Sequence, residues 1–543
     1  MPHAAAALIT AVVLAPLARP GYVLRYDMVF VPRQRLSWEM VAPADELPRA
    51  VPLDALVSLA NLAVPGWLLQ RIALAAIVYL AALGMARLVP TERTLSTVVG
   101  AFAYAWTPFL AERLLLGQWG LLLAYAALPW LAAAARDVRA GRPGATARLV
   151  LAAAPAAVTP TGGLIAVATV VALTWPKLWK GAAAVAALNA PWVVAALTSA
   201  AGGRSDPAGV AAFAARGENW SGAWGALAGT GGIWNAQTVP GSRSSVFVPI
   251  ATAVVLAVCV VGFVELRRRW PDGAVRLAVL AGGGFLLAVA GTGPTAPALE
   301  WLVVHVPGAG LLRDGQKFLV PYALLLAVTL ATGAEALADR LARRLDATAG
   351  RVVLVAAALA PVAIMPDLAF GAAGQLRPVH YPADWQEVSA RVVDGDVLSL
   401  PFHGYQRYRW NHGQVVRDPA PRYLGVPVLI NDALRVGDVT VGGESLRAAR
   451  VQALLDAGEP VARTGVRWVL VRKEPGVEVP AGALAGLRPV FDGPYLTLWA
   501  NPAPAAERRD PARRWPAAAA HLLAALVVLA AGISLLRTVR TPW

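Results

Sequence analysis

The sequence predicts a mainly α-helical, polytopic membrane protein with about twelve transmembrane helices and an inserted extracytoplasmic α/β domain. The 543 residues are 57% hydrophobic and only 15% charged, whereas soluble domains are nearer to a quarter charged. Long apolar stretches recur along the chain, more than one soluble core could use. Near residue 370 these stretches stop, and turn-rich sequence typical of short strands begins.

The apolar stretches predict twelve helices, several of them shorter than the roughly 20 residues that cross a bilayer without tilt. They lie at roughly 4–18, 68–86, 95–109, 117–134, 147–158, 161–175, 181–199, 247–265, 276–292, 318–338, 351–369 and 516–536. Residues 147–175 contain Pro155 and the turn-like run 159–163. This stretch therefore forms either one broken helix or two short ones.

Basic residues follow every second predicted helix, as they do in cytoplasmic loops. The groups are Arg87 and Arg93; Arg136, Arg139, Arg142 and Arg148; Lys177 and Lys180; Arg267, Arg268, Arg269 and Arg276; Arg340, Arg343, Arg344 and Arg351; and Arg537 and Arg540. All fall on one side of the membrane if residues 147–175 form a hairpin. This agreement predicts twelve spans in the cell membrane with both termini in the cytoplasm. The net charge of +15 then comes from basic residues in cytoplasmic loops. This position of the charge argues against nucleic acid as a partner.

This topology predicts a domain organisation with three long outer segments, at 19–67, 200–246 and 370–515. In the last of these, VLSLPF (397–402), VRWVLV (466–471) and YLTLWA (495–500) resemble short strands, and residues 444–457 have helical spacing. We therefore expect a transmembrane domain over 1–369, an extracytoplasmic α/β domain over 370–515, and a final helix with a cytoplasmic tail over 516–543.

Asp27 is the first candidate functional residue, in GYVLRYDMVFVP (21–32) directly after the first predicted helix. Ionisable residues at a membrane are costly to accommodate, which makes them candidates for function. The carboxylate either pairs with Arg25 or Arg33, or acts as a general base toward a sugar hydroxyl. The same loop also contains the carboxylates of Glu39, Asp45, Glu46 and Asp54.

A second polar group lies in TPFLAERLLLGQWG (107–120), between the third and fourth predicted helices. Glu112 and Arg113 stand at the outer end of a helix, and Gln118 follows them. The group is either a polar turn between two helices or a cluster that lines a cavity. We expect these three side chains to line a cavity.

The segment LLRDGQKF (311–318) carries Arg313 and Lys317 at the outer interface, against the positive-inside trend. On a helix, residues four apart share one face. Arg suits phosphate through its planar fork and Lys as a point charge. The pair binds either phospholipid headgroups or a substrate phosphate. The apolar run 298–310 before it is expected to form an interfacial or re-entrant helix that guides a lipid tail toward these cations.

The outer segment PFHGYQRYRWNHG (401–413) combines aromatic rings with hydrogen-bonding groups, which suits a carbohydrate surface. We expect His403, Tyr405, Arg407 and Trp410 to contact an acceptor, although a polar loop with buried aromatic side chains would have the same composition. The sequence has one cysteine and six histidines, without a CxxC, HExxH or P-loop motif. It predicts no metal site, and it argues against nucleotide-driven transport.

These segments resemble the GT-C class of membrane glycosyltransferases, and within it the actinobacterial arabinofuranosyltransferase-like and mannosyltransferase-like proteins. The resemblance rests on the acidic first loop with Asp27, on the amphipathic stretch 48–75, and on 107–130, 311–318 and YPADW (381–385). It extends over most of the membrane part. The chain lacks the long additional carbohydrate-binding regions of the larger arabinofuranosyltransferases.

The resemblance implies transfer of a sugar from a polyprenyl-phosphate donor to a cell-envelope glycan or glycolipid on the outer face. By matching position, Asp27 would deprotonate the acceptor, and Arg313 and Lys317 would hold the donor phosphate. Glu112 and Arg113 would line the cavity, and the outer domain would help to bind the acceptor. A divalent cation is common in parts of the class, and nothing in this sequence specifies one.

Two alternatives have the same membrane architecture. One is a transporter or flippase for lipid-linked intermediates, and the other is a non-catalytic assembly protein of the envelope. The predicted spans are almost free of charge, the charged candidates gather at one interface, and no internal repeat is evident. Transporters place polar residues within several spans, so this distribution favours chemistry at an outer surface.

Overall fold

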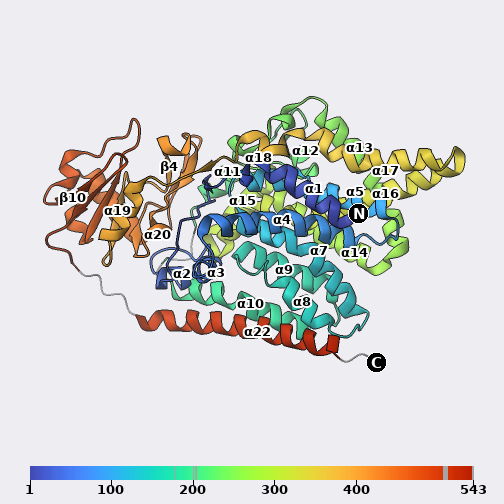
Figure 1. Ribbon diagram of the computed structural model, residues 1–543, viewed down its shortest axis with the longest axis horizontal. Helices are drawn as coiled ribbons and strands as arrows, with labels where there is room; N and C mark the ends of the chain where they lie inside the picture. The colour runs from blue at the N-terminus through green and yellow to red at the C-terminus, as the bar shows by residue number, and fades with distance from the viewer. Residues whose placement is uncertain (178, 200, 202–204, 506–510, 541–543) are drawn as a thin grey trace.

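The computed structural model describes residues 1–177, 179–199, 201, 205–505 and 511–540. Figure 1 shows a bundle of helices with a β-rich region at one end. The main bundle helices are α1 (Pro2–Leu14), α4 (Gly66–Leu88), α5 (Thr94–Ala105), α6 (Pro108–Leu115), α7 (Trp119–Arg139), α8 (Ala145–Ala153), α9 (Pro160–Thr174), α10 (Trp179–Thr198), α13 (Val248–Arg269), α14 (Pro271–Val289), α16 (Val320–Arg344), α17 (Ala347–Ile364) and α22 (Trp515–Arg540).

Helices occur at all twelve predicted places. Within the described ranges, nine helical stretches are long and apolar enough to cross a membrane. These are Gly66–Leu88, Thr94–Leu115, Trp119–Arg139, Gly181–Thr198, Val248–Arg269, Pro271–Val289, Gly315–Arg344, Ala347–Ile364 and Trp515–Thr538. The remaining predicted helices correspond to α1 and α9, which are shorter apolar helices, and to α8, which has 9 residues. The chain is therefore a multi-pass membrane protein by the length and composition of its helices.

Residues 147–175 form two helices that reverse direction. The start of α9 lies against the start of α7, because a Cβ on Gly120 would lie 2.8 Å from Thr159. At the other end of α7, the Arg139 guanidinium donates to the carbonyl of Trp175 after α9. Helices α7 and α9 therefore run parallel. Helix α8 connects the end of α7 to the start of α9. Residues 147–175 therefore form two short helices, which is one of the two alternatives that the sequence left open.

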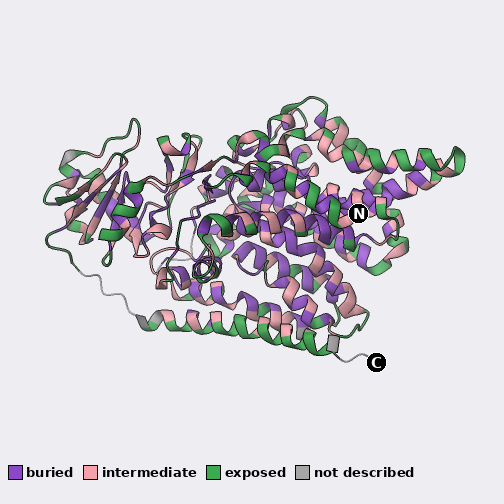
Figure 2. Ribbon diagram, in the orientation of Figure 1, coloured by how far each residue is buried: buried purple, intermediate pink, exposed green. Residues whose placement is uncertain are grey.

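Burial differs sharply between the helices (Figure 2). Most residues of α16 are buried, whereas few residues of α13, α17 and α22 are. Leu522, Leu526 and Leu529 of α22 are exposed. Such a continuous apolar surface is what a lipid-facing helix presents. Small residues bring α13 and α16 together, since a Cβ on Gly262 would overlap the backbone of Thr329.

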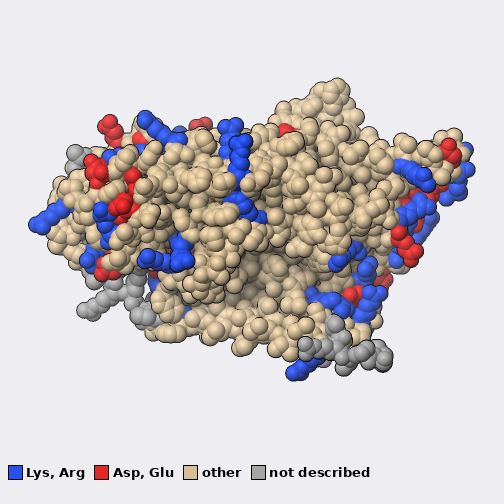
Figure 3. Space-filling view, in the orientation of Figure 1, with Lys and Arg blue, Asp and Glu red and all other residues tan. Residues whose placement is uncertain are grey.

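The predicted basic groups gather at one end of the bundle. Arg93 pairs with Asp339 at 2.5 Å, Arg269 with Glu335 at 3.0 Å, and Arg139 with Asp272 at 3.0 Å. Figure 3 shows charged side chains at the two ends of this face and a largely uncharged band between them. The side chains of Lys180 and Arg540 lie outside the described part of the chain. The β-rich region occupies the opposite end of the bundle (Figure 1).

The β-rich region contains a mixed sheet, whose described strands are ordered β10-β11-β9-β3-β6. The strands are β3 (Val397–Leu400), β6 (Val428–Leu429), β9 (Trp468–Arg472), β10 (Arg488–Asp492) and β11 (Leu496–Ala500). Strand β3 lies between β9 and β6, runs parallel to both, and is buried on both faces. Leu398 and Leu400 pack toward α21 (Leu446–Asp456), and Val397 packs with Trp385 of α19 (Ala383–Arg391). The three predicted strands and the predicted helix are confirmed.

Shorter elements complete the end of the bundle that faces the sheet. The helices are α2 (Trp38–Val41), α3 (Leu53–Ala60), α11 (Ala208–Ala212), α12 (Gly222–Ala228), α15 (Ala296–His305), α18 (Ala369–Gly374) and α20 (Ala420–Tyr423). The strands are β1 (Tyr22–Val23), β2 (Pro378–Val379), β4 (Tyr405–Arg407), β5 (Val415–Arg417), β7 (Leu434–Val436) and β8 (Val439–Val441). The apolar run 298–310 forms a helix of 10 residues, α15, too short for an untilted span.

The first loop is joined to the β-rich region by backbone pairing. Strand β1 pairs with β2 through Tyr22 and Val379. Tyr26 donates its N–H to the Val415 carbonyl at 2.7 Å and accepts from the Arg417 N–H at 2.9 Å. The loop that carries Asp27 therefore lies between the bundle and the sheet.

Candidate active site

A cavity of about 270 Å³ lies where the bundle meets the β-rich region. Its wall comes from the first loop, the starts of α7 and α9, the segment before α16, and strands of the β-rich region, which is also called the outer region below. The lining side chains include Asp27, Arg49, Leu53, Gln118, Trp119, Phe213, Trp234, Arg313, Asp314, Lys317, Tyr405, Arg417, Arg422 and Leu434. Five of the sequence-predicted site residues therefore share one cavity: Asp27, Gln118, Arg313, Lys317 and Tyr405.

Asp27 is held by two donors from distant parts of the chain. The Tyr405 hydroxyl donates to Oδ1 at 2.5 Å, and the Gln118 amide donates to Oδ2 at 3.3 Å. The alternative in which Asp27 pairs with Arg25 is not what the structure shows, because Arg25 donates to the carbonyls of Leu115 and Gln237 and to Gln375. Burial and the neighbouring Asp27 raise the pKa of Tyr405 well above its usual value, so this hydroxyl stays a donor.

The backbone around Asp27 is fixed by a close approach of two loops. The Asp27 N–H donates to the Leu116 carbonyl at 3.2 Å. Gly117, with φ at +77°, allows this contact, because a Cβ there would lie 2.2 Å from the Met28 nitrogen. Glycine is required at such a position for both its conformation and its size. The sequence Leu-Gly-Gln thus places Gln118 beside the carboxylate.

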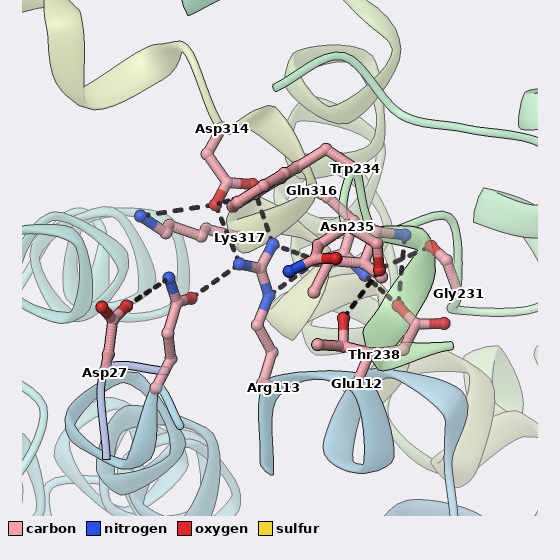
Figure 4. Close-up of polar contacts among 12 residues, drawn as sticks. Asp27, Glu112, Arg113, Gly231, Trp234, Asn235, Thr238, Asp314, Gln316 and Lys317 are labelled. Atoms are coloured by element: carbon pink, nitrogen blue, oxygen red, sulfur yellow. Dashed lines mark hydrogen bonds and ion pairs between the residues drawn. The ribbon is translucent and has the colours of Figure 1, made fainter. Parts of the chain in front are cut away.

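Arg113 organises the wall behind the cavity, as Figure 4 shows. It donates to both carboxylate oxygens of Asp314 at 2.8 Å, to Gln118 at 2.6 Å and to Gln316 at 2.8 Å. Asp314 in turn pairs with Lys317 at 3.4 Å and accepts from the Trp234 indole at 3.4 Å. A continuous polar chain therefore joins the candidate base Asp27 to the candidate phosphate-binding Lys317.

The charge state of Asp314 is fixed by its cationic neighbours. Burial alone would raise the pKa of its carboxyl, but Arg113 and Lys317 lower it to about 2. Asp314 therefore remains ionised at any physiological pH. It orients Lys317 and neutralises part of the local positive charge.

The expectation that Glu112 and Arg113 line the cavity is corrected. Both are fully buried, and they form the layer behind its wall. Thr107 caps α6 by accepting from the Leu110 N–H at 3.2 Å, and Pro108 occupies the first turn. This break separates α6 from α5 and turns Glu112 inward, where it accepts from Gln316 at 3.0 Å and from the Ile233 N–H at 3.2 Å.

Arg313 and Lys317 both reach the cavity, but from a different local structure than predicted. They lie on the consecutive 3₁₀ turns Ala309–Leu312 and Gly315–Leu319 and their junction, so they do not share one face of an α-helix. Arg313 lies over the Phe213 ring and donates to Glu444 of the outer region at 3.1 Å. The side chain of Lys317 is 25% exposed, so a ligand can reach it.

Three further cations of the cavity were missed by the sequence analysis. Arg417 pairs with Glu46 at 3.2 Å, Arg422 with Asp54 at 3.1 Å, and Arg49 with Glu444. They come from loops and short strands without helical or strand periodicity. Glu46 and Asp54 of the first loop pair with Arg417 and Arg422. These two carboxylates are therefore the sequence signal that could have pointed to the two arginines.

The acceptor candidates of the outer region are split by the structure. Tyr405 lines the cavity. His403 donates from Nδ1 to the Tyr405 carbonyl at 2.7 Å, and Arg407 donates to the Gly413 carbonyl at 3.1 Å. Trp410 stacks on Tyr408 within an aromatic cluster, with ring centroids 5.0 Å apart. These three side chains are not among the residues that line this cavity, and their contact with an acceptor stays a prediction.

The side of the cavity toward the bundle is less charged. Leu53, Trp119, Leu121 and Pro160 contribute to its wall. Helix α9 begins here, with Thr159 as its capping residue. The cavity therefore has charged side chains on one side and apolar side chains on the other.

Carboxylates near the cavity are the groups that could hold a divalent cation. Among the described residues, no group of three or more His, Cys, Asp or Glu side chains converges as metal ligands do. Asp27 binds Gln118 and Tyr405, and Asp314 binds Arg113 and Lys317. These carboxylates do not fit a shared metal site.

Comparison with known proteins identifies a fold. Neither a family model nor a curated protein matches the chain. Two cryo-EM structures of a mutant form of the arabinofuranosyltransferase AftD from Mycobacteria are similar, with TM-scores of 0.52 and 0.53 and sequence identities of 19% and 18%. Both alignments cover 93% of this chain and 41% of AftD, so the chain spans less than half the length of that protein. Over 93% of its length, the chain therefore has a fold similar to part of AftD.

Proposed function

We propose that the protein is a membrane glycosyltransferase that moves a sugar from a polyprenyl-phosphate donor to a glycan or glycolipid of the cell envelope. The convergence of Asp27, Lys317 and Arg313 in one cavity is the observation that carries this proposal. A carboxylate beside cations is what glycosyl transfer from a phosphate requires. The likeness to AftD supports the proposal at the level of the fold.

The residues of the cavity would have separate roles in this reaction. The acceptor hydroxyl gives its proton to Asp27 as its oxygen forms a bond to the anomeric carbon of the donor sugar. The bond from that carbon to the phosphate oxygen breaks, and polyprenyl phosphate leaves with the electron pair. Lys317 and Arg313 stabilise the negative charge that develops on the leaving phosphate.

Asp27 is set for this role by its two donors. Tyr405 and Gln118 hold the carboxylate in one orientation, with one oxygen on each side. Gln118 is itself held by Arg113. The fully buried Arg113 and Glu112 therefore act as positioning residues, and Tyr405 carries the contribution of the outer region to the acceptor side.

We further propose that the cavity faces the outside of the cell. The basic groups at the opposite end of the bundle carry the Arg and Lys excess of cytoplasmic loops. Both termini would then be cytoplasmic, and residues 370–515 would form the extracytoplasmic domain over the cavity.

A transfer assay with the purified full-length protein tests the proposal. Polyprenyl-phosphate pentoses and hexoses are offered as donors with short envelope-type glycans as acceptors. We expect Asp27→Asn to lose about 10²-fold or more of the transfer rate, as loss of a general base does, while binding of polyprenyl monophosphate is retained.

Asp45→Asn serves as the matched control, because it removes another carboxylate of the first loop. Full transfer by Asp27→Asn would remove this residue from the mechanism. Saturable movement of polyprenyl phosphates across liposome membranes without any transfer of sugar would instead favour a transporter.

A further inference from the structure

The cations of the cavity already have carboxylate partners. Lys317 pairs with Asp314, Arg417 with Glu46, and Arg422 with Asp54. Arg49 and Arg313 share one carboxylate, that of Glu444. An incoming phosphate must therefore replace one of these carboxylates, because an added anion among paired charges gains little.

Glu444 occupies a complete anion site. It accepts from Arg49, from Arg313 at 3.1 Å and from the Ser205 hydroxyl at 2.6 Å. Its side chain is only 2% exposed, and that of Arg313 is 11% exposed. Burial raises the pKa of Glu444, but Arg49, Ser205 and Arg313 together hold it below its ordinary value. The carboxylate is thus a bound anion with donors that would suit a phosphate equally well.

The segment that carries Glu444 is different from those that carry the other carboxylates. Glu444 follows the β7–β8 hairpin, whose Leu434 lines the cavity. The hairpin contacts the bundle through the Gly442 N–H, which donates to the Asp206 carboxylate at 2.7 Å, whereas the Glu444 N–H donates to Asp432 of its own β-rich region at 2.6 Å. Asp314, by contrast, is locked by two bonds from the buried Arg113. Glu444 is therefore the carboxylate that can leave with its segment.

We propose that Arg49, Arg313 and Ser205 form a phosphate site that the chain's own Glu444 occupies until the β7–β8 hairpin withdraws. The inference rests on the proposed function for the nature of its ligand, a polyprenyl phosphate. Withdrawal removes one carboxylate and frees two guanidinium groups and a hydroxyl. The phosphate then restores their hydrogen bonds, so the exchange leaves no buried cation without a partner.

The first test measures the affinity of the full-length protein in nanodiscs for polyprenyl monophosphate. We expect Glu444→Gln to tighten binding by about tenfold or more, since a charge-assisted hydrogen bond to a competing group is of this order. Glu459→Gln, which removes an exposed carboxylate paired with Arg463 elsewhere in the outer region, should leave the affinity unchanged. Unchanged or weaker binding by Glu444→Gln would overturn the proposal.

The second test locks the hairpin. A Cβ on Gly442 would lie 3.9 Å from the Asp206 Cβ, a distance that a disulfide bond spans. The double variant Asp206→Cys, Gly442→Cys should bind polyprenyl monophosphate weakly when oxidised and regain its affinity on reduction. The native Cys259 is buried in α13, away from this pair. Equal affinity of the oxidised and reduced forms would refute withdrawal of the hairpin.

The outcomes distinguish failure of the Glu444 proposal from failure of the proposed function. If Arg313→Ala with Lys317→Ala abolishes binding while Glu444→Gln has no effect, the donor site is supported. The occupation of the phosphate site by Glu444 is then refuted. If neither the native protein nor Glu444→Gln binds polyprenyl monophosphate, the donor site and the Glu444 proposal fall together. Tight binding by Glu444→Gln alone supports both.

Discussion

The buried pair of Arg113 and Asp314 offers a measurable test of how the cavity wall is held. Replacing Arg113 by Met removes a fully buried guanidinium and leaves the Asp314 carboxylate, 8% exposed, without its two strongest donors. Breaking a buried pair in this way costs about 3–5 kcal/mol. That corresponds to a shift of roughly two to nearly four orders of magnitude in the unfolding equilibrium.

The double variant Arg113→Met, Asp314→Asn distinguishes an unpaired charge from a packing defect. Removing both charges abolishes the uncompensated carboxylate, so we expect at least half of the lost stability to return. The assay is equilibrium unfolding of the protein in mixed micelles with increasing SDS, followed by tryptophan fluorescence. The exposed pair Arg391 and Glu387 provides a control, because Arg391→Met should cost less than about 1 kcal/mol.

Two results would contradict this reasoning. A cost below about 1 kcal/mol for Arg113→Met would show that water or another donor satisfies Asp314 in its place. An undiminished cost in the double variant would show that the size and shape of Arg113 matter, and its charge does not.

Further predictions concern Tyr405, Gly117 and Glu474. Tyr405→Phe should lower the rate of sugar transfer by about tenfold or more with little change in polyprenyl phosphate affinity, because it removes the 2.5 Å hydrogen bond to Asp27; equal loss of both would make Tyr405 a binding residue. Gly117→Ala should destabilise the protein by more than about 1 kcal/mol and reduce transfer, since its φ of +77° and the contact with Met28 exclude a Cβ; native-like melting would contradict this. Burial raises the pKa of Glu474 from 4.5 to about 7, so its native form binds the proton more strongly. Stability should therefore fall as pH rises from 4.5 through 7, and Glu474→Gln should flatten that slope in thermal melts; an unchanged slope would refute the assignment.

Much of the membrane part was predictable because its signals are local. Apolar runs mark the helices. The Arg and Lys groups fall on one side of the membrane only if residues 147–175 reverse direction, and this condition led to the expectation of two helices there. The break between α5 and α6 was missed, although Thr107 and Pro108 carry its capping signal. This break decides that Glu112 and Arg113 turn inward, which apolar periodicity cannot reveal.

The site was predictable only where a chemical type stood out against its surroundings. Arg313 and Lys317 are conspicuous because they depart from the positive-inside trend, whereas Asp27 had four other carboxylates of the same loop beside it. Arg417 and Arg422 were missed because their places depend on pairing with the first loop, hundreds of residues earlier in the chain. Glu444 was missed for the same reason, since no local pattern tells that it reaches Arg313.

The pairing of the first loop with the start of the outer region also constrains how the protein is made. Tyr22 meets Val379, and Tyr26 meets Val415 and Arg417. When ribosomes have inserted α1 and α4, the loop between them has none of these partners. It must wait through the synthesis of more than half of the chain before its backbone is satisfied. A truncated chain that ends after α17 should therefore leave this loop more accessible to proteases than it is in the full chain, while its helices are already in the membrane.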